Sequence, residues 1–145
     1  MRGSLFAAAA LMACAAAPAA SAQNGDAFTG TWAFQTNDYG NAQYVVAMSG
    51  VAVVTPSAPG RYDIRLIANE IIGERSTGRT QLITAREACT GEVDGEVFNI
   101  ACQMAEPLEG YEPDNFILQS GEESDQMVGV LSSAASGQVT FTRMR

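Results

Sequence analysis

The chain has 145 residues, of which 47% are hydrophobic and 17% are charged, and its net charge at pH 7 is −8. This acidic balance argues against nucleic acid or an anionic membrane surface as a partner. Lysine and histidine are both absent, which excludes a histidine general base and a histidine-bound zinc ion.

Residues 1–22 are predicted to be a cleavable export signal. Arg2 gives a basic start, an apolar stretch covers 5–17, and the small residues Ala20 and Ala22 precede Gln23, as in a secretory signal peptide. The apolar stretch is shorter than the roughly 20 residues that span a bilayer. We therefore expect the mature part, 23–145, to be a single periplasmic or secreted domain without a transmembrane span.

Residues 11–14 allow an alternative, because Leu-Met-Ala-Cys resembles a lipoprotein box. Lipidation at Cys14 would anchor the protein to a membrane. Met12 fits such a box poorly, and the sequence after Cys14 stays apolar instead of becoming a polar tether. We therefore favour cleavage after residue 22, which removes this cysteine.

Beyond the signal, apolar and polar residues alternate with a period of two in short segments that end at Gly, Pro, Asn or Asp. No stretch of a dozen residues shows a helical stripe, so the mature chain is predicted to be all-β. The first strand is expected near 28–35, with Phe28, Trp32 and Phe34 on one face. Further strands are expected at 44–55, at 61–70, on both sides of 94–96, and at 115–119, 126–132 and 138–144.

The connections between these strands are predicted from their turn residues. Gly50 is expected to mark a bulge or bend, because a glycine inside a strand has no side chain to pack. Residues 56–60 are expected to form a connection, the stretch after residue 70 that passes through Gly73 and Gly78 to be irregular, and 106–114 to form the longest loop.

Eight strands with mostly short connections favour antiparallel neighbours in chain order. Such a meander either closes into an up-and-down barrel or folds into a β-sandwich. We favour the eight-stranded barrel because closure removes exposed strand edges. The sandwich is the alternative.

The two cysteines of the mature part can pair in an oxidising compartment. A two-residue type II′ turn at 95–96 sets Asp94 opposite Val97. Counting outward, Cys89 then faces Cys102 in a non-hydrogen-bonded pair, whose Cα atoms lie about 4.5 Å apart. That separation permits a disulfide, which is predicted to point inward or to be half-buried.

No P-loop or dinucleotide-binding fingerprint occurs, and we expect neither a cofactor nor a bound metal. Two carboxylate groups offer oxygen ligands of the kind that Ca²⁺ prefers, although neither has the spacing of an EF-hand. One comprises Glu109, Glu112, Asp114 and Asn115, and the other comprises Glu122, Glu123 and Asp125. A hydrolase that uses two carboxylates is a further alternative, for which the sequence selects no pair.

The segment Phe28-Thr29-Gly30-Thr31-Trp32 resembles the F-x-G-x-W signature of the calycins, the lipocalin and avidin-like eight-stranded barrels. This resemblance implies that Trp32 closes one end of a barrel and that Arg143, late in the last strand, packs over it. The second lipocalin signature has no counterpart here, and an avidin-type biotin site would use several tryptophans where this chain has one. Residues 112–116 and 125–129 also resemble stretches in small uncharacterised exported proteins of Gram-negative bacteria. That resemblance indicates no particular function.

We expect a non-enzymatic binding protein whose barrel holds a small apolar molecule. The predicted ligand contacts are Trp32, Phe34, Tyr62, Leu66, Phe98 and Phe116. Small barrels can equally be filled by their own side chains, so the size of the cavity is decisive. The alternative is a protein-binding module, such as an inhibitor of an exported protease, that uses residues 23–27 and the loop near Tyr111.

Overall fold

The computed structural model describes residues 27–145, so the predicted signal peptide and Cys14 lie outside the described residues. Within the described part no helix has the length and apolar character needed to cross a membrane. The strands are β1 (Gly30–Thr36), β2 (Tyr39–Gly40), β3 (Tyr44–Ala58), β4 (Arg61–Glu74), β5 (Thr80–Asp94), β6 (Val97–Met104), β7 (Asn115–Ser120), β8 (Gln126–Ser132) and β9 (Ser136–Arg143).

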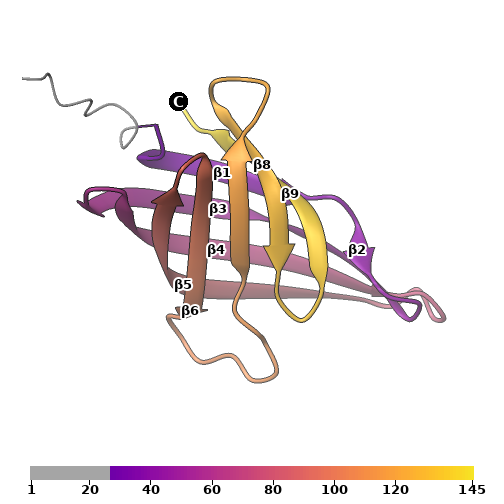
Figure 1. Cartoon of the computed structure of the whole chain (residues 1–145). Coiled ribbons are helices and arrows are strands. Elements are labelled where there is room, and N and C mark those ends of the chain that lie inside the picture. The colour runs from indigo at the N-terminus through magenta and orange to yellow at the C-terminus, as the bar shows by residue number, and fades with distance from the viewer. Residues whose placement is uncertain (1–26) are drawn as a thin grey trace, which may run out of the picture.

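Strand pairing closes the sheet into a barrel. The order is β1-β9-β8-β7-β6-β5-β4-β3, and β3 pairs with β1 again to complete a ring of eight antiparallel strands. The short β2 is an additional strand that pairs with β3. In Figure 1 the long β3, β4 and β5 run across one side of the molecule, and β7 to β9 stand on the other side. The predicted barrel is confirmed, and the ring of pairings excludes the sandwich.

Period-two alternation determines which side chains fill the barrel. Phe28, Trp32 and Phe34 are buried at alternate positions, as predicted, and so are Tyr62, Ile64, Leu66 and Ala68 of β4. Burying one face of every strand removes apolar area from water, which stabilises the fold by about 25 cal/mol per Å². The core is therefore continuous around the ring of strands.

Gly50 corrects one expectation, because β3 has no bulge there. The residue pairs in register with Phe34 of β1 and with Ala68 of β4. A Cβ atom at Gly50 would lie 2.1 Å from the carbonyl oxygen of Ile67 and 2.5 Å from the ring of Phe34. Glycine is needed at this position because the Phe34 ring lies directly against the backbone.

Two expected connections are shorter in the structure than the sequence suggested. Strand β3 continues through Pro56 to Ala58 with its irregularity between these two residues. Proline is tolerated there because β1 pairs with β3 only as far as Val54, so no neighbour on that side needs the missing N–H.

The stretch predicted to be irregular after residue 70 is mostly strand. Pairing of β4 with β5 continues from Ile71↔Leu82 to Gly73↔Thr80, because cross-strand apolar pairs stabilise the extended hairpin. Gly78, at φ 70°, supplies the left-handed residue of the turn.

The predicted hairpin register is confirmed. Asp94 faces Val97, Cys89 faces Cys102, and Gly95 has a φ of 62° as the first residue of a type II′ turn requires. The two cysteines form a disulfide with their Cα atoms 4.0 Å apart. Cys89 is buried and Cys102 is half-buried, so the bridge belongs to the core as expected.

Candidate functional site

The six predicted ligand residues are buried core residues, and four of them pack on aromatic neighbours. Phe34 stacks on Phe141 with ring centroids 5.0 Å apart, and Phe116 meets both of them edge-on. Tyr62 and Phe98 form a second aromatic group with Phe28. Trp32 and Leu66 are each 1% exposed, and none of the six lines the cavity described below. Their role as ligand contacts stays a prediction.

Trp32 and Arg143 are paired across β1 and β9, and the guanidinium lies 4.3 Å from the centre of the indole ring. Arg143 also donates hydrogen bonds to the carbonyl oxygens of Thr29 and Ala27. The indole N–H of Trp32 donates to the carbonyl of Phe28 at 2.9 Å. The contact between Trp32 and Arg143 that the F-x-G-x-W segment implied is present. It connects the residues that precede β1 to the last strand.

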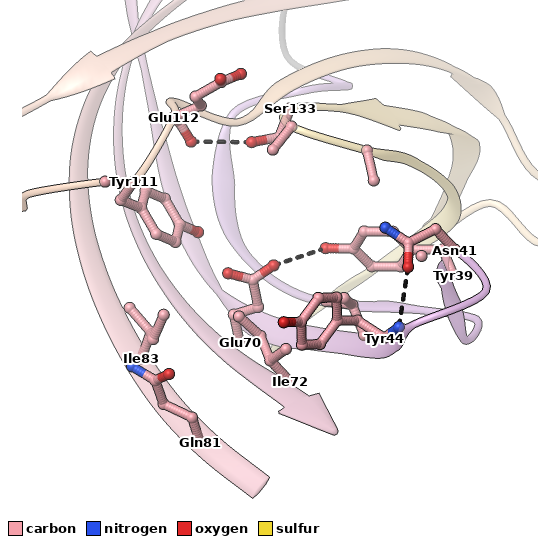
Figure 2. A pocket seen from close by; sticks show the side chains of 15 residues that line it. Tyr39, Asn41, Tyr44, Glu70, Ile72, Gln81, Ile83, Tyr111, Glu112 and Ser133 are labelled. Atoms are coloured by element: carbon pink, nitrogen blue, oxygen red, sulfur yellow. Dashed lines mark hydrogen bonds between the residues drawn. The ribbon is translucent and has the colours of Figure 1, made fainter. Parts of the chain in front are cut away.

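A cavity of about 380 Å³ lies away from Trp32, bordered by the far part of the β4–β5 hairpin and by two loops, and we call it the mouth cavity. Figure 2 shows Glu70 projecting its carboxyl group between Tyr111 and Tyr39, with Tyr44, Ile72 and Ile83 around it. The lining consists of Tyr39, Gly40, Asn41, Tyr44, Val46, Glu70, Ile72, Gln81, Ile83, Gly110, Tyr111, Glu112, Ser133, Ala134 and Ala135.

Segments that lie far apart in the sequence supply the walls of the mouth cavity. Glu70 and Ile83 face one another across β4 and β5, where the inward alternation of both strands continues past the aromatic core. Tyr39 lies on β2, which pairs with β3 at Val46. Tyr111 belongs to the long loop between β6 and β7, and the hydroxyl of Ser133 fixes this loop by donating to the carbonyl of Glu112 at 2.9 Å.

Two carboxyl groups are buried next to this wall. Glu87 is 2% exposed and Asp114 is fully buried. The amide N–H of Asp114 donates to Glu87 Oε1 at 3.1 Å, and the hydroxyl of Tyr111 donates to Asp114 Oδ2 at 2.8 Å. The other two oxygens, Glu87 Oε2 and Asp114 Oδ1, have no hydrogen-bond donor in the described residues.

One proton shared by this pair would satisfy both remaining oxygens. Burial and the neighbouring Asp114 raise the pKa of Glu87 to about 8, and burial also raises the pKa of Asp114. Two desolvated carboxyls in contact cannot both ionise cheaply. Glu87 is therefore the protonated member at neutral pH, and it can donate to Asp114.

Glu70 brings a third carboxyl group to the cavity wall. The hydroxyl of Tyr39 donates to Glu70 Oε1 at 3.3 Å. Burial raises the pKa of Glu70, and the charge of Asp114 raises it further. Burial of Tyr39 and Tyr111, together with the charges of the adjacent carboxyl groups, raises the pKa values of both phenols well above the usual range. Both phenols therefore stay protonated and act as hydrogen-bond donors.

Neither of the two sets of carboxylates considered as Ca²⁺ ligands comes together around one point in the described structure. Asp114 points into the core toward Tyr111, Glu109 and Glu112 are exposed, and Asn115 accepts from the backbone N–H of Cys102 at 3.0 Å. In the later turn Asp125 pairs with Arg145 at 3.0 Å. Within residues 27–145 the three side chains close enough for one ion are Glu87, Cys89 and Cys102, and the disulfide occupies both of these sulfurs.

Sequence reasoning did not identify the mouth cavity, although two signals were present. Glu70 continues the inward series that runs through Leu66 and Ala68. Glu87 stands two residues before Cys89, which the hairpin register had already placed inward. An acidic residue on an otherwise apolar face is expensive to bury, and it therefore marks either a paired or a functional group.

No protein-family model matches the chain, and no curated protein matches its sequence. Similar solved structures do exist. A de novo designed fluorescence-activating β-barrel has a TM-score of 0.56 at 16% identity, over 82% of this chain and 95% of the designed chain. A redesigned barrel, mFAP1, bound to DFHBI gives 0.57 at 16% identity, over 81% and 96%.

A further redesigned β-barrel gives a TM-score of 0.60 at 14% identity, over 88% of this chain and all of that chain. At these identities the likeness shows the fold alone. The chain shares the closed antiparallel β-barrel of these designed proteins.

Proposed function

We propose that this protein is an exported binding protein that takes a small, largely apolar molecule into the mouth cavity. The observation that carries the proposal is the cavity itself. Its volume of about 380 Å³ lies within the roughly 300–1,000 Å³ of small-molecule sites. Its wall combines apolar and aromatic side chains with a few polar groups, which is also typical of such sites.

The filled core supports placing the ligand at the mouth rather than in the barrel interior. Phe34, Phe116 and Phe141 already pack on one another, and displacing them would lose contacts worth several kcal/mol. The mouth cavity needs no such displacement. The similar redesigned barrel mFAP1 is bound to DFHBI, so a β-barrel of this kind is compatible with a small ligand.

Ile83→Trp tests the location of the ligand, because the larger ring would occupy the mouth cavity. Leu82→Trp is the matched control, since the adjacent residue lies on the outer face and is 66% exposed. The probe is the neutral fluorophore N-phenyl-1-naphthylamine, and its fluorescence is titrated with both variants and the unchanged protein after circular dichroism has verified their fold.

We expect the unchanged protein and Leu82→Trp to bind the probe with similar affinity. Ile83→Trp should bind it at least about tenfold more weakly, which corresponds to 1.4 kcal/mol. Equal affinity of all three proteins would remove the mouth cavity as the site. Failure of the unchanged protein to bind would contradict the proposed function.

Export is tested separately by the intact mass of the protein recovered from the host's periplasm or medium. We expect a chain that starts at Gln23. A chain that starts at a lipid-modified Cys14 would replace this proposal with a membrane anchor.

A further inference from the structure

We infer that the ligand of the mouth cavity is an organic cation, an amine or quaternary ammonium group on an aromatic or apolar body, held with its charge against Glu70. The inference rests on the proposed function and names the class of molecule that the site takes.

Glu70 has no cationic partner among the described residues. Glu70 is half-buried, and its hydrogen-bond donor in the structure is the phenol of Tyr39. The ion pairs of residues 27–145 join Arg61 to Glu92, Arg79 to Glu74, Arg86 to Glu106 and Arg145 to Asp125, so none involves Glu70. A carboxylate in such a partly desolvated wall is stabilised by a cation that comes from outside.

The charges around Glu70 favour a cation in the cavity. The charge of Asp114 acts on Glu70 and on the tyrosines beside it, and no arginine of residues 27–145 lines the cavity. Arg75 donates to the carbonyl of Asn41, itself a lining residue, at 3.0 Å, and Arg79 pairs with Glu74 at 3.1 Å. The charged side chains of the lining, Glu70 and Glu112, are both acidic, and low-dielectric walls strengthen their negative field.

The wall of the cavity around Glu70 is aromatic. Tyr39, Tyr44 and Tyr111 line the cavity together with Glu70, and Figure 2 shows the carboxyl group of Glu70 directed between two of these rings. Aromatic rings attract cations through the negative faces of their π systems, and they are the usual means of recognising ammonium groups. The apolar side chains of Val46, Ile72 and Ile83 complete a surface for the body of the ligand.

The same wall disfavours a metal ion as the cation. Ca²⁺ requires six to eight oxygen ligands, whereas Glu70 belongs to no group of three acidic or sulfur side chains within ion-binding distance in the described part of the chain. One carboxylate framed by tyrosine rings suits a large, weakly hydrated cation better.

Three probes with the same indole ring test the inference: tryptamine, which is cationic, tryptophol, which is neutral, and indole-3-propionate, which is anionic. Isothermal titration calorimetry at pH 7 measures their affinities for the unchanged protein, for Glu70→Gln and for Glu92→Gln. The last variant is the matched control, because it removes the same charge from an exposed side chain of β5. Calcium chloride is titrated as a fourth probe.

We expect tryptamine to bind at least about tenfold more tightly than tryptophol, as a charge-assisted hydrogen bond implies, and indole-3-propionate to bind most weakly. Glu70→Gln should abolish the preference for tryptamine and leave tryptophol affinity unchanged. Glu92→Gln should preserve the preference.

Equal affinities for tryptamine and tryptophol would overturn the inference that the ligand is a cation and would leave the proposed function intact. A preference for tryptamine that survives Glu70→Gln, or displacement of tryptamine by Ca²⁺ at equal concentration, would also overturn it. Failure of every indole probe to bind would overturn the inference of a cationic ligand as well, and failure of N-phenyl-1-naphthylamine to bind would contradict the proposed function together with this inference.

Discussion

Replacing Glu87 by glutamine should make the protein more stable at neutral and mildly alkaline pH. The glutamine side chain has almost the same shape, and its NH₂ group can donate to Asp114 Oδ1, which has no donor in the described structure. Glu87 can make that bond only while it is protonated. In the variant the hydrogen bond to Asp114 Oδ1 is therefore present at every pH, whereas Glu87 donates it only below its pKa.

The size of the effect follows from the pKa shift. Burial raises the pKa of Glu87 from an ordinary 4.5 to about 8. Between these values the unfolded chain loses a proton that the folded protein keeps, so stability is fully present below pH 4.5 and falls as pH rises toward 8. At about 1.4 kcal/mol per pKa unit, the loss due to Glu87 is on the order of 3 to 5 kcal/mol.

Urea unfolding at pH 5, 6, 7 and 8 measures the difference in free energy of unfolding between Glu87→Gln and the unchanged protein. We expect the free energies of unfolding of the two proteins to agree within about 1 kcal/mol at pH 5. At pH 8 the variant should be more stable by about 3 kcal/mol or more. Glu92→Gln, whose side chain is 65% exposed, is the control for the lost charge. Parallel pH profiles for Glu87→Gln and the unchanged protein would refute a protonated Glu87 in the folded state.

Three further variants test the scaffold by urea unfolding. Replacing Cys89 and Cys102 together by serine should lower the free energy of unfolding by about 3 kcal/mol, because the closed loop no longer constrains the unfolded chain. Arg143→Ala should cost about 1 to 3 kcal/mol, since it leaves two backbone carbonyls without their donor and removes the cation from the ring of Trp32. Gly50→Ala should cost about 3 kcal/mol, because its methyl group would overlap backbone and ring atoms.

Each of these substitutions has its own control. Chemical reduction of the unchanged protein should reproduce the effect of the two serines, and a smaller loss would place the stabilisation elsewhere. Arg143→Lys should recover less than half of the loss, because lysine lacks the planar fork that reaches both carbonyls. Ser49→Ala changes the exposed neighbour of Gly50, and if it destabilises as much as Gly50→Ala does, the close approach of Phe34 is not the cause.

The fold could be predicted from the sequence because its determinants are local. Alternation in β4 fixed the inward positions of Tyr62, Leu66 and their neighbours. The turn at 95–96 fixed the pairing of Cys89 with Cys102 by counting alone. Where prediction failed, the cause was packing between distant residues: Gly50 looked like a bulge because nothing local indicates that Phe34 covers it.

The candidate site could not be predicted in the same way because five separate segments build it. Tyr39, Glu70, Ile83, Tyr111 and Ser133 come together only after the ring of strands closes. The large aromatic residues drew attention to the core, and a buried aromatic residue looks the same in a sequence whether it packs against other side chains or against a ligand. The inward carboxyls of Glu70 and Glu87 were the better guide.

Intermolecular nuclear Overhauser effects, measured on the labelled protein saturated with N-phenyl-1-naphthylamine, test the central claim most directly. Contacts from the probe to Tyr39, Ile83 and Tyr111 are the result expected for a ligand in the mouth cavity. Contacts to Phe34, Phe98 and Phe116 would instead place the ligand inside the barrel and contradict the site proposed at its mouth.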